Sequence, residues 1–120
     1  MKIVVDTSVI IDFLRTKSLH SLFVRLRHKH TITISLISYA ELFSSRSAQK
    51  KGEQRDTLEN ILANLEVIIP TKETAELCGQ MRAKYHISLP DAFIAALAVE
   101  QHMSLATLNL KDFEKIKGLK

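Results

Sequence analysis

The chain has 120 residues, which is enough for one domain and too few for two. Hydrophobic residues make up 46% of it and charged residues 25%, a balance that excludes disorder as its main state. The single cysteine excludes an intrachain disulfide and a cysteine-based zinc site, and three glycines are too few for a glycine-rich phosphate loop. The net charge of +4 is mild, and it is compatible with solubility alone or with attraction to phosphate.

We expect a cytoplasmic protein without a membrane segment. Asp6 and Asp12 interrupt the one apolar run near the N-terminus, so it does not resemble a signal peptide. The longest uncharged stretch, residues 31–40, is far short of a membrane span. A lone cysteine also suits the reducing cytoplasm.

Four short β-rich runs alternate with helical patterns along the chain. The predicted strands cover residues 2–5, 31–35, 66–69 and 105–108. Because strands separated by helices need crossover connections, this alternation predicts a parallel sheet with helices on both faces. The expected fold is a single three-layer α/β/α domain over residues 1–120, with a central sheet of about four parallel strands.

Apolar residues at helical spacing mark the segments between these strands. The spacing i, i+3, i+4, i+7 occurs over residues 19–26 and again over residues 58–65. Residues 77–85 show another apolar face, and Thr71 is the expected cap of that helix, in a partial capping box. A further helix is expected to begin at Pro90, since proline is favoured in a first helical turn.

Acidic residues lie where a parallel sheet carries its functional groups, at the carboxyl ends of strands. Asp6 directly follows the first predicted strand, and Glu41 lies in an apolar stretch after the second. Asp91 begins a helix whose next eight residues carry no charge, so that helix is expected to be buried. Asn109 and Asp112 follow the fourth strand, and either of them brings a further oxygen.

Each of these acids also has a simpler interpretation. Asp6 and Asp112 are both candidate helix caps. Glu41 is equally well explained as a residue on a helix surface. Asp91 suits the dipole at a helix start, which explains its position but not the burial of the helix.

Taken together, the acids favour a metal site. Carboxylates gathered at one sheet edge repel one another by about 4 kcal/mol per close pair at an effective dielectric constant of 20. Protons or cations relieve that repulsion, and all-oxygen ligands favour Mg²⁺ or Mn²⁺ over zinc. Such an ion activates water for attack on a phosphodiester. Thr7 and Ser8 are expected to support Asp6 through their hydroxyl groups.

The segments that carry these acids resemble the PIN-domain family and, within it, the VapC-type toxins of prokaryotic toxin–antitoxin pairs. In chain order they read VVDTSVIID, ISYAEL, LPDAFIAA and TLNLKDF, at residues 4–12, 37–42, 89–96 and 107–113. No single segment is specific, but the set is specific in its order and spacing. The resemblance covers nearly the whole chain.

The resemblance implies a Mg²⁺-dependent endoribonuclease that cleaves RNA phosphodiester bonds with metal-activated water, Mn²⁺ being the alternative ion. It implies that Asp6, Glu41 and Asp91 are catalytic metal ligands. The fourth acidic position of the family falls on Asn109 or on Asp112. Both stay candidate metal ligands, and Asp112 is also a candidate catalytic residue. The resemblance further implies an RNA substrate, a homodimer and a cognate antitoxin that covers the acidic pocket with a basic side chain.

Two other classes of protein compete with this interpretation. A non-catalytic PIN-like module that binds RNA or protein would keep the fold and lose acids, so the presence of Asp6, Glu41 and Asp91 argues against it. A receiver-like signalling domain is also an α/β domain with acids at strand ends. It needs a central aspartate after a strand, but Asp56, the one central aspartate, precedes a helical pattern.

Overall fold

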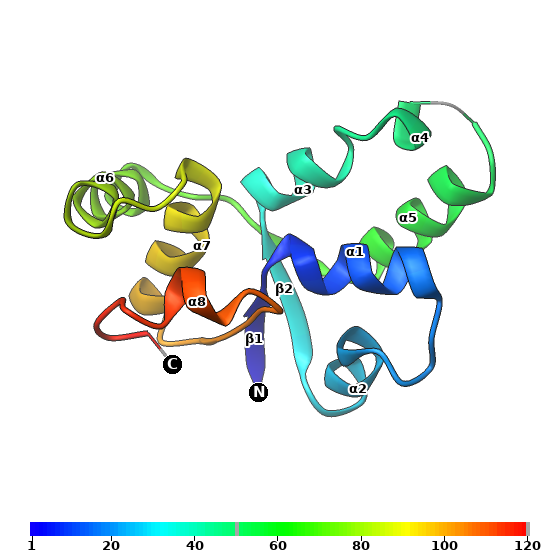
Figure 1. The fold of residues 1–120 in the computed structure, drawn as a ribbon, viewed down its shortest axis with the longest axis horizontal. Coiled ribbons are helices and arrows are strands. Elements are labelled where there is room, and N and C mark those ends of the chain that lie inside the picture. Colours follow the sequence, from blue (N-terminus) through cyan, green and yellow to red (C-terminus); the bar gives the residue numbers. More distant parts are fainter. Residues whose placement is uncertain (50, 120) are drawn as a thin grey trace.

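A computed structural model describes residues 1–49 and 51–119 as a parallel sheet with helices on both faces (Figure 1). The strands are β1 (Lys2–Val5), β2 (Thr31–Ser35), β3 (Glu66–Ile68) and β4 (Ser104–Ala106). Their order in the sheet is β3-β2-β1-β4, and every neighbouring pair is parallel. The predicted three-layer α/β/α fold with four parallel strands is confirmed.

The N-terminal strand β1 lies inside the sheet, between β2 and β4. Val4 pairs with Thr33 on one side and with Leu105 on the other. Because all strands run the same way, their carboxyl ends meet at one edge of the sheet. The chain therefore leaves β1 at Asp6 and β4 at Thr107 on the same edge.

The helices divide between the two faces of the sheet. Helices α1, α2 and α5 lie on one side, and α6, α7 and α8 lie on the other (Figure 1). In the described part of the chain, no helix is long and apolar enough to cross a membrane. The bounds of the helices are α1 (Thr7–Thr16), α2 (Leu22–Lys29), α3 (Leu36–Leu42), α4 (Arg46–Gln49), α5 (Glu53–Ala63), α6 (Lys72–Tyr85), α7 (Leu89–Glu100) and α8 (Leu110–Phe113).

The core follows from the alternation of side chains along the strands. Ile3 and Val5 pack with residues of α1, α2 and α5, whereas Val4 points to the opposite face and packs with Ile94 and Leu97 of α7. The uncharged run in α7 is buried as predicted, and its small residues let the helix approach the sheet closely. The buried residues of α7 are Ala92, Ile94, Ala95, Ala96, Leu97 and Ala98.

Side-chain hydroxyl groups cap the N-termini of several helices. Ser21, Ser35 and Ser88 each accept a hydrogen bond from a backbone N–H in the first turn of α2, α3 and α7. Thr71 and Thr74 form a complete capping box at α6, where the sequence predicted a partial one, because the Thr74 hydroxyl accepts from the Thr71 N–H.

Some predicted boundaries are wrong by a few residues. Strand β4 begins and ends earlier than expected, so Thr107 and Leu108 belong to the loop after it. Strand β3 is one residue shorter than predicted. Leu19 lies outside α2 and is 78% exposed, because Ser21 caps the helix and sets its start. Hydrophobic spacing alone does not mark a cap, which is why the prediction began too early.

Candidate active site

Asp6 is held by hydroxyl groups at the end of β1. It is 4% exposed and occupies the N-cap position of α1, but its side chain makes no capping hydrogen bond. Its Oδ2 atom instead accepts hydrogen bonds from Ser8 Oγ at 2.9 Å and from Thr107 Oγ1 at 2.8 Å. The Thr7 hydroxyl makes a longer contact of 3.4 Å with Oδ1. The helix-cap interpretation of Asp6 is therefore wrong.

Thr107 is a site residue that the sequence analysis did not single out. It is buried in the loop after β4, and the pairing of β4 with β1 brings it to Asp6. The predicted fourth strand extended through Leu108, so Thr107 was placed inside a strand. A hydroxyl residue directly after the true end of β4 is the signal that would have identified it.

Glu41 lies near the end of α3, the helix that directly follows β2. Its side chain is largely exposed, but its carboxyl is partly buried. This partial burial is the main cause that raises the pKa of Glu41. The negative charges of Asp6 and Asp91 raise this pKa further. A plain helix-surface position accounts for the exposure of Glu41 but not for this coupling to two other acids.

Asp91 lies in the first turn of α7, behind the cap provided by Ser88. Burial is the largest cause that raises its pKa, and the charge of Asp6 is the next. A hydrogen bond from Ser88 lowers the pKa, and the charge of Asp112 raises it again. The helix dipole favours a charged carboxylate here, but burial and the neighbouring acids outweigh it.

The two candidates for the fourth position lie in different surroundings. Asp112 is part of the one-turn helix α8, and its effect on Asp91 places it within electrostatic reach of the other acids. Asn109 occupies the N-cap position of α8 with an exposed side chain that makes no capping hydrogen bond. Neither residue caps α8 through its side chain, and Asp112 is the one coupled to the acid cluster.

Asp6, Glu41, Asp91 and Asp112 form an electrostatic cluster rather than an assembled set of ligands. Among the described residues, no three His, Cys, Asp or Glu side chains lie as close together as the ligands of one metal ion. The chemistry of the donors still fits a hard divalent cation, because all four are carboxylates and two of them have raised pKa values. Glu41 is exposed, so its side chain has room to change rotamer.

Comparisons with known proteins identify the family to which this fold belongs. The family model of the PIN domain matches residues 3–119. The chain belongs to the PIN-domain family. This PIN-domain chain is 34% identical to ribonuclease VapC10 of Mycobacterium tuberculosis over 98% of its length and 90% of that protein's length. It is 30% identical to ribonuclease VapC1 of Methanocaldococcus jannaschii, over 99% of its length and 85% of that protein's length.

Solved structures show the same PIN-domain fold. A DNA-bound VapBC from Salmonella typhimurium superposes with a TM-score of 0.83 at 26% identity, over 100% of this chain and 96% of that one. A toxin–antitoxin complex from Klebsiella pneumoniae gives 0.80 at 28% identity, over 98% and 95% of the two chains. The predicted resemblance to VapC-type PIN domains is therefore confirmed. The receiver-like alternative is wrong, and Asp56 lies in the first turn of α5 rather than after a strand.

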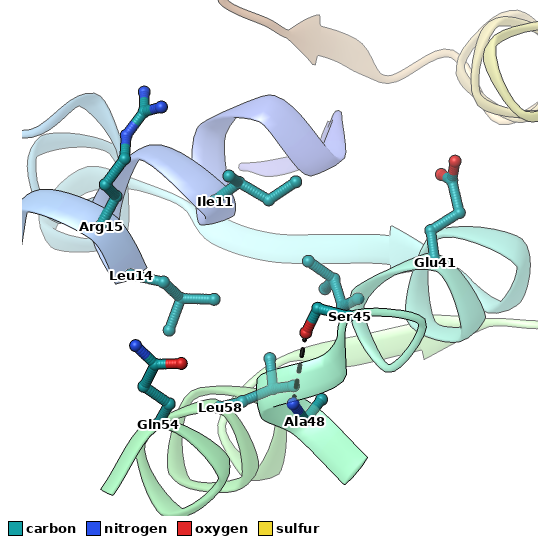
Figure 2. A pocket seen from close by; sticks show the side chains of 9 residues that line it. Ile11, Leu14, Arg15, Glu41, Ser45, Ala48, Gln54 and Leu58 are labelled. Atoms are coloured by element: carbon teal, nitrogen blue, oxygen red, sulfur yellow. Dashed lines mark hydrogen bonds between the residues drawn. The ribbon is translucent and has the colours of Figure 1, made fainter.

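A pocket of about 300 Å³ lies beside Glu41, between α1, α3, α4 and α5 (Figure 2). Most of its lining is aliphatic, and Ile11 at its mouth is 47% exposed. Figure 2 shows Arg15 and Glu41 on opposite sides of Ile11, with both charged ends extending away from the aliphatic floor. The other lining residues are Leu14, Leu42, Ser45, Ala48, Gln54 and Leu58.

Proposed function

We propose that this PIN domain is a Mg²⁺-dependent endoribonuclease and the toxin of a toxin–antitoxin pair. The observation that carries the proposal is that four carboxylates from separate elements lie within electrostatic reach, Asp6 and Asp91 acting on Glu41, and Asp6 and Asp112 acting on Asp91. The matched relatives that are named ribonucleases, and the solved complexes of toxin with antitoxin, support the same activity. An RNA substrate also fits the predicted cytoplasmic location.

The four carboxylates would hold Mg²⁺ or Mn²⁺, with Asp6 as the most firmly positioned of them. When bound, the ion supplies positive charge and activates water for hydrolysis of a phosphodiester. Hydrolysis adds water across one P–O bond, so one RNA product ends in a phosphate and the other in a hydroxyl. The chain's own part is to orient the carboxylates, and the hydroxyls of Ser8 and Thr107 do so for Asp6.

Arg15 is suited to bind the RNA backbone beside this cluster. It is exposed at the mouth of the pocket next to Glu41, and it forms no ion pair within the described part of the chain. A guanidinium binds a phosphate through two parallel hydrogen bonds. We propose that Arg15 binds a phosphate of the RNA backbone on the side of the pocket away from Glu41.

Metal dependence is the direct test of this activity. Purified protein is expected to cleave a fluorescently labelled single-stranded RNA in Mg²⁺ or Mn²⁺ and to lose cleavage in EDTA, with recovery when excess Mg²⁺ is restored. Asp6→Asn is the control against a contaminating nuclease. Full cleavage in EDTA would overturn the mechanism, and RNA binding without cleavage would favour the non-catalytic module.

The aliphatic pocket beside Glu41 supports an antitoxin partner. A basic side chain of the antitoxin would form charge-assisted hydrogen bonds with the acid cluster. An apolar side chain next to it would fill the pocket and cover Ile11, which is otherwise 47% exposed. The partner segment that we propose therefore carries an apolar residue close to an arginine or lysine.

Growth of bacteria separates toxicity from antitoxin binding. Expression of the wild type alone is expected to arrest growth, and co-expression of the protein encoded next to it is expected to restore growth. Asp6→Asn is expected to be harmless. Ile11→Glu should stay toxic but resist rescue, whereas Leu19→Glu, at a site 78% exposed and outside the pocket, should be rescued as the wild type is. Equal growth of all strains would exclude a toxin.

We also propose that the protein forms a homodimer. Ser35 and Ile68 pair in the sheet, and Leu36 and Ile69 directly follow them at the same end of β2 and β3. They are 41% and 69% exposed, which leaves apolar surface uncovered in the single chain. Light scattering is expected to give twice the chain mass for the wild type and a smaller mass for Ile69→Glu. A monomeric wild type would contradict this.

A further inference from the structure

The loop after β4 is hydrogen-bonded back to the hydroxyl groups that hold Asp6. The Leu108 N–H donates to Ser8 Oγ at 3.1 Å, and the Asn109 N–H donates to Thr107 Oγ1 at 2.9 Å. Each hydroxyl therefore connects the Asp6 carboxylate with one backbone N–H of the loop. The contact between β1 and β4 continues in this way beyond the ends of the strands.

The direction of these bonds follows from the chemistry of the donors. A backbone N–H only donates, so the oxygens of Ser8 and Thr107 accept from the loop. Each hydroxyl has one hydrogen, and Asp6 Oδ2 lies within hydrogen-bond distance of both. Both hydroxyls therefore donate to Oδ2 of the carboxylate. Oδ1 keeps the single longer contact with Thr7, so it is the oxygen of Asp6 that is most available to a cation.

The short helix α8 is anchored at its end by Phe113, which is buried among residues of α6 and α7, so the loop hydrogen bonds act on its start. It has four residues, and its buried residue is Phe113, whereas Leu110 is 67% exposed. The Asp112 N–H donates to the Asn109 carbonyl at 3.0 Å, so the start of α8 follows directly from the position of Asn109. Asp91, by contrast, lies on α7, a helix that is buried along most of its length. The position of Asp112 therefore depends on the loop hydrogen bonds at the start of α8 as well as on Phe113, whereas Asp91 is held by α7 without the loop.

We propose that Ser8 and Thr107 are positioning residues that place Asp112 relative to Asp6. Through the same pair of hydroxyl groups they hold one carboxylate directly and the loop that carries the other carboxylate indirectly. Removing either hydroxyl releases one loop N–H and one bond to Asp6 together. The part of this inference that concerns metal binding rests on the proposed function, whereas the structural connection does not.

Hydrogen exchange in the metal-free protein tests the connection itself. Thr107→Val keeps the shape of the side chain and removes the hydroxyl, so the Asn109 amide is expected to exchange about 5- to 10-fold faster. Thr107→Ser restores the hydroxyl and is expected to restore slow exchange. Thr33→Val is the matched control, because Thr33 is also buried but its hydroxyl donates to the Ile3 carbonyl away from the site. Unchanged exchange in Thr107→Val would overturn the proposal.

Calorimetric titration with Mg²⁺ tests the consequence for Asp112. Thr107→Val is expected to weaken Mg²⁺ binding about 10-fold, as loss of a supporting hydrogen bond typically does. In an Asp112→Asn background the same substitution should have a smaller effect, because only the direct bond from Thr107 to Asp6 then remains to be lost. An equal loss in both backgrounds would show that Thr107 does not act through Asp112. If the wild type neither binds Mg²⁺ nor cleaves RNA, the proposed function fails, and the exchange experiment still decides the connection.

Discussion

Asp6 and Glu41 belong to the same acid cluster but are held in different ways. Asp6 is 4% exposed, follows a strand inside the sheet and accepts two short hydrogen bonds from hydroxyl groups. Glu41 is exposed on the seven-residue helix α3, beside a pocket rather than beneath packed side chains. One part of the site is thus positioned by the sheet and by hydrogen bonds, and the other has room to adjust.

This difference indicates a division of roles within the proposed activity. A carboxylate that is fixed before a cation binds loses little freedom on binding, so it defines where the ion is held. An exposed carboxylate at the mouth of a pocket is able to respond to what enters, whether RNA or a partner protein. Substitutions in the two regions are therefore expected to differ in how much RNA cleavage they remove and in how much of it excess metal restores.

The largest effect is expected at the fixed position. Asp6→Asn removes a ligand charge and places an amide where Oδ2 accepts two hydrogen bonds. We expect RNA cleavage to fall by at least about 100-fold, which exceeds the typical effect of losing a supporting residue, and added Mg²⁺ should not restore it. Single-turnover cleavage measures the loss. Asp12→Asn, on the same helix, is the control that should cleave normally.

A smaller loss is expected at Glu41. Glu41→Gln removes the charge of an exposed side chain, so we expect cleavage to fall about 10-fold at low Mg²⁺, and raising the Mg²⁺ concentration should restore part of it. The measurement is the rate of cleavage as a function of Mg²⁺ concentration. If Glu41→Gln is as inactive as Asp6→Asn at every concentration, the two carboxylates are equally indispensable and the proposed division of roles is wrong.

The two candidates for the fourth acidic position of the family are separated by one substitution each. Asp112→Asn removes a negative charge that acts on Asp91, whereas Asn109→Ala removes an exposed amide. We expect the first change to weaken Mg²⁺ binding about 5- to 10-fold and the second to have little effect, because Mg²⁺ prefers charged oxygen ligands. Titration calorimetry on both variants decides between them. Two equal and negligible effects would mean that the site depends on three acids alone.

The smallest effect concerns the stability of the protein in a chelator. The pKa of Asp91 is raised from its ordinary value of 3.8, so the folded state binds this proton more tightly than the unfolded state does. The free energy of unfolding therefore falls as the pH rises from about 4 through the raised pKa, and the loss is complete above it. Asp91→Asn removes this loss, and we expect its Tm in EDTA at pH 7 to exceed that of the wild type by about 1–3 °C.

Melting curves at several pH values test the sign of this effect. The difference in Tm between Asp91→Asn and the wild type should shrink as the pH falls through the raised pKa of Asp91, because the aspartate then becomes protonated and uncharged, as the asparagine is. Added Mg²⁺ should stabilise the wild type more than the variant, because it binds the intact set of carboxylates. A variant that is less stable than the wild type in EDTA at neutral pH would contradict the repulsion that we infer among the acids.

Local sequence determined much of this protein. Short-range preferences for strand or helix were correct in two places. The β-branched run before Asp6 forms β1, and the proline and uncharged run around Asp91 form α7. Asp6 was found because it directly follows the first strand, and Asp91 because it begins the uncharged helix. Where the prediction was off, as for Leu19 and the end of β4, a cap or a strand end differed by a few residues.

Tertiary structure alone decided which of these residues meet. The order β3-β2-β1-β4 places β1 beside β4 and so brings Asp6 into a hydrogen bond with Thr107, 101 residues away. Periodicity reports which side of an element is buried but carries no information on which strand becomes its neighbour. The sequence predicted that the hydroxyls of Thr7 and Ser8 support Asp6, and only the folded chain shows that Thr107 joins them and that the carboxylate does not cap the helix.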